Sequence, residues 1–148
     1  MKPYIRKVQY YETDMMGIAN HANYIHWLEE ARIDFMDQMG YPYARMEAEG
    51  FLSPVRAVSC QYKRPCTFGD TLAIQVIAES YNGVVLTLRY DLRRQDTGEA
   101  LCEARSEHVF TTREGRLIRT ARQLPEFHAA LLHQIEADSA RPAPKSND

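Results

Sequence analysis

The sequence predicts a single α+β domain in which one long helix packs on one face of an antiparallel sheet. Its 148 residues fit one domain, since domains typically hold about 100 to 200 residues. One amphipathic helical stretch lies near the N-terminus, and the chain after it alternates runs of strand chemistry with tight turns, which is typical of antiparallel pairing. The expected order is strand, long helix, four or five strands and a short helix, which pack as a helix layer on a sheet.

The long helix is expected over residues 22–39. Asn20 is a suitable N-cap, and Gly40 is a suitable residue just beyond the C-terminus. Apolar side chains recur at intervals of three and four residues, the spacing of one helix face: Tyr24, Leu28, Ala31, Phe35 and Met39. At 1.5 Å per residue the helix is about 27 Å long, enough to cross a small sheet. Arg32, at the edge of this face, hints at a buried ion pair.

The rest of the chain predicts strands and one further helix. Strands are expected at residues 3–12, 53–62, 71–81, 84–94, 100–112 and 117–119, with a helix over 125–136. Asn82-Gly83 predicts a two-residue type I′ hairpin turn, which needs positive φ at both residues. An open sheet has edges that must be paired or covered, so we expect a dimer joined through strands.

The composition is that of an ordinary soluble protein, with 45% hydrophobic and 26% charged residues. A net charge of −2 gives no general attraction for nucleic acid. No apolar stretch is long enough for a membrane span, and the N-terminus lacks a signal-peptide pattern, so the chain reads as mature from residue 1. Three cysteines without a CxxC pair favour a reducing cytoplasm and no metal site. We expect one domain over 1–138 and a disordered tail over 139–148.

Chemistry is expected in residues 10–24, which join the first strand to the long helix. Nucleotide-binding, serine-hydrolase and zinc-protease motifs are absent from the sequence. This segment offers a carboxylate, Asp14, then Gly17, then the unpaired amides of a helix start, which can stabilise a developing oxyanion. A carboxylate opposite such amides makes a minimal acyl-transfer site without Ser, Cys or metal. The alternative is that Asp14 only accepts local backbone hydrogen bonds.

These residues resemble a known family. The run from Val8 to Arg32, VQYYETDMMGIANHANYIHWLEEAR, is similar to the signature of the 4-hydroxybenzoyl-CoA thioesterase and YbgC-like acyl-CoA thioesterase family of hotdog-fold proteins. A second block from Tyr62 to Asp70, YKRPCTFGD, is similar to that family's turn between strands. The resemblance covers about residues 3–125. It implies a hotdog fold, an antiparallel sheet wrapped around one long central helix, and hydrolysis of a small or medium acyl-CoA.

The resemblance also implies roles for the matching residues. Asp14 is expected to act as nucleophile or general base, and Gly17 to let substrate approach the backbone. His21 is expected to contribute the helix-start amide that polarises the thioester carbonyl, while its side chain either helps catalysis or caps the helix. Tyr10 matches an active-site tyrosine. Asn23 and Tyr24 match the motif as substrate-binding residues, although Tyr24 also fits the core.

The substrate and partners follow from the same resemblance. Coenzyme A carries phosphate groups, so cationic side chains are expected beside the pocket. The candidates lie near predicted strand ends: Lys63, Arg64, Arg113, Arg116 and Arg119. No cofactor is implied, since coenzyme A belongs to the substrate, and an acyl-carrier-protein thioester stays open as an alternative. Family members form dimers, often paired into tetramers with sites at subunit interfaces.

The sequence leaves two other functions open. The first is a hotdog protein that binds acyl-CoA without hydrolysing it, as a sensor or accessory protein; the presence of Asp14 argues against it. The second is a hydratase or dehydratase, which the seven-residue separation of Asp14 and His21 does not favour.

Overall fold

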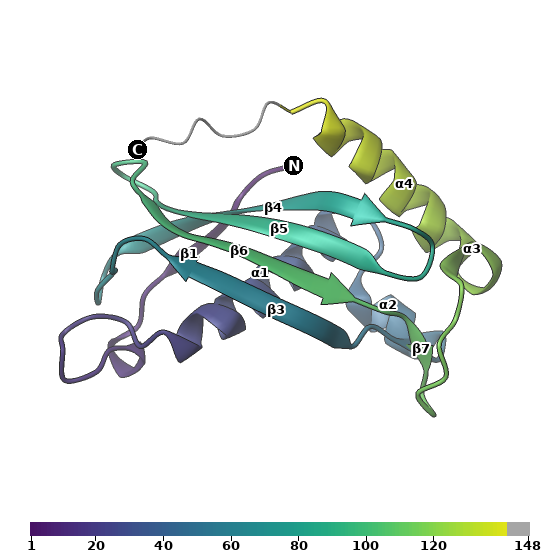
Figure 1. Cartoon of the computed structure of the whole chain (residues 1–148), viewed down its shortest axis with the longest axis horizontal. Helices are drawn as coiled ribbons and strands as arrows, with labels where there is room; N and C mark the ends of the chain where they lie inside the picture. Colours follow the sequence, from purple (N-terminus) through teal and green to yellow (C-terminus); the bar gives the residue numbers. More distant parts are fainter. Residues whose placement is uncertain (142–148) are drawn as a thin grey trace.

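The computed structural model describes residues 1–141 and shows a five-stranded antiparallel sheet with one long helix across it (Figure 1). Its strands are β1 (Tyr4–Lys7), β2 (Phe51–Leu52), β3 (Val55–Tyr62), β4 (Thr71–Tyr81), β5 (Leu86–Arg94), β6 (Ala100–His108) and β7 (Thr111–Thr112). Its helices are the 3₁₀-helix η1 (Tyr10–Glu12), α1 (Ala22–Gln38), α2 (Tyr43–Ala48), α3 (Thr120–Gln123) and α4 (Pro125–Ser139). The sheet order is β1-β4-β5-β6-β3, and β2 pairs with β7 separately. The predicted α+β class is confirmed.

Helix α1 lies where the sequence predicts it and forms the centre of the core. The side chain of Asn20 accepts the amide of Ala22 at 3.0 Å, and Gly40 follows the helix with φ of 83°. The buried face consists of Tyr24, Trp27, Leu28, Ala31, Arg32, Phe35 and Met36. Apolar side chains of the central strands join it in one core cluster: Leu72, Ile74, Val76, Leu88, Tyr90 and Leu92. Arg32 forms no ion pair within residues 1–141, so that expectation is wrong.

Three predicted strands are shorter than expected. β1 ends at Lys7, because the chain then turns into η1, where the amide of Glu12 binds the carbonyl of Gln9 at 3.1 Å. The strand expected over 100–112 is divided, since β6 ends at His108 and β7 pairs with β2. Residues 117–119 contribute only a single bridge to Thr111.

The hairpin at Asn82-Gly83 exists, but its turn is not type I′. Gly83 has φ of 89°, whereas no described non-glycine residue has positive φ. The side-chain oxygen of Asn82 accepts the amides of Val84 at 2.9 Å and Val85 at 2.7 Å. This local bonding stabilises a wider loop, so β5 begins only at Leu86.

The C-terminal helix is longer than predicted and is fastened to the sheet. Helix α4 continues to Ser139, and the carboxylate of Asp138 accepts the amide of Ala78 in β4 at 2.9 Å. Of the tail expected over 139–148, Ser139 is therefore helical, and residues 142–148 lie outside the described part. In residues 1–141 no helix combines the length and apolar character that crossing a membrane requires.

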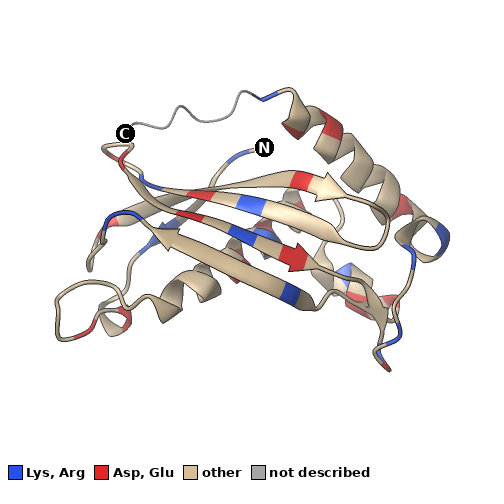
Figure 2. Cartoon of the chain, viewed as in Figure 1, with Lys and Arg blue, Asp and Glu red and all other residues tan. Residues whose placement is uncertain are grey.

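Strand β3 forms one edge of the sheet and pairs only with β6 (Figure 1). Its apolar side chains Val55, Val58 and Tyr62 are exposed. Figure 2 shows residues of both charges interspersed along the strands, and many are paired, such as Arg105 with Glu79 at 3.0 Å. This sheet surface therefore does not favour polyanion binding.

Candidate active site

The two sequence blocks that carry the family resemblance lie side by side in the fold. The first block includes the connection between η1 and α1, residues 13–21, and the second includes the connection between β3 and β4, residues 63–70. Hydrogen bonds join the two blocks, among them those from the Ala19 amide to the Cys66 carbonyl (2.8 Å), from the Thr67 hydroxyl to the Gly17 carbonyl (2.7 Å) and from the Tyr62 hydroxyl to the His21 carbonyl (3.2 Å). The candidate site is therefore assembled from the loop that precedes α1 and from the connection between β3 and β4.

Asp14 lies exposed near the start of the loop between η1 and α1. Its carboxylate accepts the amide of Met16 at 2.8 Å and lies 3.5 Å from the side-chain amide of Asn20. The turn closes at Gly17, whose amide binds the Asp14 carbonyl at 2.9 Å and whose φ is 77°. Both the catalytic prediction and its alternative concern this one carboxylate, which accepts local hydrogen bonds yet stays open to solvent.

The start of α1 leaves one main-chain donor unused. The amide of Ala22 binds the Asn20 side chain, and the amide of Asn23 binds the Asn20 carbonyl at 3.0 Å. Within residues 1–141, the amide of His21 has no hydrogen-bond acceptor. The His21 side chain does not cap the helix; Asn20 does. A free amide at a helix start can bind an anionic oxygen.

Asn20 connects the start of α1 to the carboxylate of Asp14. It directly precedes His21, and its side chain bonds at one end to Ala22 and reaches Asp14 at the other. The structure thus brings Asp14, Gly17 and His21 together in one loop. Within this loop, the Asn20 side chain contacts both the Asp14 carboxylate and the Ala22 amide.

The other predicted site residues have different surroundings. Tyr10 is exposed and packs edge-to-face on Phe68, with ring centroids 5.6 Å apart. The side-chain amide of Asn23 binds the Glu12 carbonyl at 2.9 Å, so in this structure it holds the protein's own main chain. Tyr24 is 3% exposed and its hydroxyl lies 3.3 Å from the sulfur of Cys66. Burial raises the pKa of Tyr24, and this tyrosine belongs to the core.

Apolar side chains around the loop are unusually exposed: Tyr10, Tyr11, Met15, Met16, Tyr62 and Phe68. Exposed apolar patches of this kind mark binding surfaces for ligands or other proteins. The Tyr62 hydroxyl keeps its proton at neutral pH, as a tyrosine with an ordinary pKa does, and donates to the His21 carbonyl at 3.2 Å.

The predicted cations do not gather in one chain. Lys63 and Arg64 follow β3 and bind the Leu101 carbonyl at the start of β6 through their amides. Arg113 and Arg116 come after the other end of β6, beyond β7. Since a strand rises about 3.3 Å per residue, the two pairs lie roughly 25 Å or more apart. Lys63 is paired with Glu103 at 3.5 Å and Arg64 with Glu99 at 3.2 Å.

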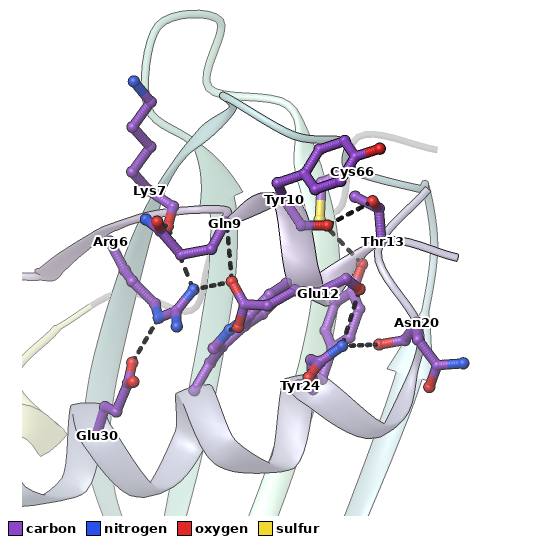
Figure 3. A network of polar contacts seen from close by, with 12 residues as sticks. Arg6, Lys7, Gln9, Tyr10, Glu12, Thr13, Asn20, Tyr24, Glu30 and Cys66 are labelled. Atoms are coloured by element: carbon purple, nitrogen blue, oxygen red, sulfur yellow. Dashed lines mark hydrogen bonds and ion pairs between the residues drawn. The ribbon is translucent and has the colours of Figure 1, made fainter. Parts of the chain in front are cut away.

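A buried carboxylate, Glu12, supports the loop and was missed by the sequence reasoning. It lies within the quoted motif and is 3% exposed. Burial by itself raises its pKa, but hydrogen bonds from Arg6, the Gln9 amide and Trp27 outweigh burial and hold the pKa below its usual value. Figure 3 shows Arg6 and Gln9 beside the carboxylate of Glu12. The sequence signal that could have identified Glu12 is its place in the motif, between the candidate site residues Tyr10 and Asp14.

Residues 8–135 match a family model described as the thioesterase-like superfamily. The chain belongs to the thioesterase-like superfamily. The family prediction is confirmed, and with it the prediction of a thioester hydrolase at the level of the family. Among residues 1–141 no group of three or more potential metal-binding side chains could hold an ion.

Named thioesterases are similar in both sequence and structure. The chain is 35% identical over 125 residues to a putative acyl-CoA thioesterase, YneP, of Bacillus subtilis, covering 84% of this chain and 90% of the relative. It is 30% identical to the acyl-CoA thioester hydrolase YbgC of Escherichia coli, over 54% of this chain and 60% of that one. A DHNA-CoA thioesterase structure from Staphylococcus aureus aligns with TM-score 0.88 and 26% identity, covering 96% of each chain.

Proposed function

We propose that this thioesterase hydrolyses small or medium acyl-CoA thioesters to the free acid and coenzyme A. Asp14 delivers the nucleophile, and the amide of His21 binds the oxygen that becomes negative. The observation that carries the proposal is the unused amide of His21 in the same loop as the exposed Asp14 carboxylate. Between them, the Asn20 side chain binds the Ala22 amide and reaches Asp14.

The reaction needs only modest help. Sulfur donates weakly into the carbonyl and thiolate leaves readily, so a thioester is more easily attacked than an oxygen ester. One oxyanion donor contributes about 10² to 10³ in rate and a general base about 10² to 10⁴. A carboxylate and an amide are therefore a sufficient set, and neither a metal nor a cofactor is part of the proposal.

Self-association across β3 would complete the phosphate-binding surface. β3 is an uncovered edge strand, and antiparallel pairing of two copies through this edge brings the β6–β7 end of one copy beside Tyr62 of the other. In that arrangement Arg113 and Arg116 of one copy approach Lys63 and Arg64 of the second. A dimer, or a pair of dimers, is thus the assembly we propose, in the cytoplasm as the cysteine content predicts.

The decisive test is Asp14→Asn. We expect hydrolysis of acyl-CoA to fall at least about 100-fold while acyl-CoA binding persists, because the variant keeps the turn but loses the charged oxygen. The measurement is thiol release over a panel of aryl, short-chain and medium-chain acyl-CoA and acyl-carrier-protein thioesters. Undiminished turnover by the variant would remove Asp14 from the mechanism.

A single turnover in H₂¹⁸O tests for direct attack by Asp14. If the carboxylate forms a mixed anhydride, water that attacks the Asp14 carbonyl leaves ¹⁸O in the protein, whereas water that attacks the acyl carbonyl leaves ¹⁸O in the product acid. If Asp14 acts as general base, ¹⁸O enters the product acid alone. Mass spectrometry that finds ¹⁸O in Asp14 therefore establishes direct attack, and trapping of an acyl-enzyme with hydroxylamine covers the case in which only the acid is labelled.

Non-hydrolytic acyl-CoA binding is the second candidate. It is favoured by the hydrogen bond from the Met16 amide, which occupies one oxygen of Asp14. Wild-type protein that binds acyl-CoA at micromolar concentration but releases no thiol from any member of the panel would establish it.

A further inference from the structure

We propose that Glu12 is the positioning residue of this site and fixes Asp14 relative to the amide of His21. The inference rests on the proposed function, because positioning has meaning only if those two groups act together. The contacts of Glu12 divide into those of its side chain, which fasten it to β1 and α1, and those of its carbonyl, which reach the start of α1.

The side chain is held by three donors from three elements. One carboxylate oxygen accepts the Gln9 amide at 2.8 Å and the Arg6 guanidinium at 2.5 Å. The other accepts the indole N–H of Trp27 at 2.7 Å. Trp27 is fully buried in α1, and the Arg6 guanidinium lies 5.3 Å from its ring centroid. The carboxylate thus ties β1 and η1 to the second turn of α1 (Figure 3).

Charge makes these contacts hard to replace. A buried carboxylate is stable only when paired and fully hydrogen-bonded. Arg6, whose side chain is 12% exposed, provides the pairing and also binds Glu30 at 2.7 Å on the solvent side. Removing the charge from Glu12 leaves Arg6 one remaining carboxylate partner, Glu30, whose side chain is 37% exposed.

The carbonyl of Glu12 passes this anchoring to the site. It accepts the amide of Asn20 at 2.8 Å and the side-chain amide of Asn23 at 2.9 Å. These two residues flank His21 closely, and Asp14 is only two residues beyond Glu12 in the sequence. One residue therefore sets the position of both halves of the proposed site. A shift of about 1 Å between reacting groups can lower a rate about 100-fold.

The experiment compares Glu12→Gln with Glu30→Gln. Glutamine keeps the size of residue 12 but replaces one acceptor oxygen by an NH₂ donor that faces Arg6 or Trp27. We expect kcat for acyl-CoA hydrolysis to fall about tenfold or more with KM changed less than about threefold. Glu30→Gln removes only the outer partner of Arg6, and we expect kcat to stay within about twofold of wild type.

A second readout reports the anchoring itself. Trp27 is the single tryptophan of the chain, so its indole N–H gives one resonance in a ¹⁵N correlation spectrum. Glu12→Gln should move this resonance to the position of a weaker hydrogen bond, whereas Glu30→Gln should leave it nearly unchanged. A purely structural role for Glu12 predicts lost stability without the selective loss of kcat in the folded protein.

The outcomes separate this inference from the proposed function. If Asp14→Asn loses hydrolysis while folded Glu12→Gln, with its indole resonance displaced, keeps kcat within twofold, the positioning role is wrong and the proposed function stands. If Asp14→Asn retains hydrolysis, both fall. Should Glu12→Gln not fold, Trp27→Phe removes one donor and keeps an aromatic ring at this buried position. Unchanged kcat in that variant contradicts the inference, and a severalfold loss with unchanged KM supports it.

Discussion

Polar groups have opposite surroundings before the start of α1 and along its second half. At its start, Asp14 and the His21 amide lie at the surface among exposed methionines and tyrosines. Along its second half, Arg32 and Phe35 line a small cavity together with His108, and both polar side chains are buried. The first region is open to solvent and the second is nearly filled, so we expect substitutions in the first to change activity and in the second to change stability.

The second region contains a buried polar chain. The hydroxyl of Tyr90 lies 2.8 Å from that of Ser106, which lies 2.6 Å from Nε2 of His108. Nδ1 of His108 has no partner within residues 1–141. Burial, helped by the nearby Arg32 charge, lowers the pKa of His108 to about 3. The imidazole is therefore neutral in the folded protein at any ordinary pH.

The largest expected effect is that of Phe35→Ala. Phe35 is 1% exposed, and deleting a buried phenyl ring typically costs about 3–5 kcal/mol. We expect that loss in denaturant unfolding, with kcat of the folded protein unchanged. A fall in kcat at full folding would show that the two halves of α1 are coupled.

Next comes the pH dependence set by His108. Below pH 6.5 the histidine of the unfolded chain is protonated, whereas His108 of the folded protein stays neutral. Its contribution to the free energy of unfolding is therefore fully present above pH 6.5 and declines as pH falls toward 3. The expected loss at pH 5 is about 2 kcal/mol. In His108→Gln this contribution disappears. Between neutral pH and pH 5 the free energy of unfolding of the wild type should therefore fall about 2 kcal/mol more than that of the variant. Parallel curves would mean that His108 protonates freely when folded.

A smaller effect is expected at Gly17. Its φ of 77° disfavours a side chain although the space around it is open, so Gly17→Ala should cost about 1 kcal/mol through backbone strain alone. Gly40 offers a matched control, with φ of 83° and open space around it just beyond the far end of α1. Both variants should lose similar stability, but only Gly17→Ala should lower kcat. Equal kcat in the two variants would contradict a role for the Asp14–Gly17 turn.

The smallest expected effect is that of Tyr62→Phe. This change removes the 3.2 Å hydrogen bond to the His21 carbonyl and keeps the ring contact with Tyr24, whose centroid is 4.9 Å away. The bond is exposed, so stability should change by less than about 1 kcal/mol. Since the bond steadies the residue that carries the free amide, kcat should fall about two- to fivefold. Steady-state kinetics with one acyl-CoA is sufficient to measure it.

Helices and strands whose bounds depend on neighbouring residues could be predicted from the sequence. The apolar periodicity and caps of α1 and the alternation of Leu72, Ile74 and Val76 in β4 gave bounds close to those observed. The division of β6 from β7 was missed, because Thr111 and Thr112 pair with Phe51 and Leu52 about sixty residues earlier. No periodicity reports such a long-range partner.

The site was predicted in part for the same reason. Asp14, Gly17 and His21 are close in sequence, and the loop keeps them together. Glu12 was missed because its importance depends on Arg6 and Trp27, which meet only when β1 packs on α1. The cations near strand ends were grouped wrongly for one chain, since Lys63 and Arg113 mark opposite ends of the sheet and the sequence does not distinguish the two ends.

The open side of β3 has a consequence for handling the protein. Its sequence, VRAVSCQY, contains neither proline nor lysine, and the features that oppose the addition of another strand, Arg56 and the register shift between Val55 and Ala57, are confined to its first residues. A solitary molecule therefore offers a template on which further chains can stack. We expect that substitutions blocking orderly pairing at this edge will yield fibrous precipitate instead of a soluble monomer.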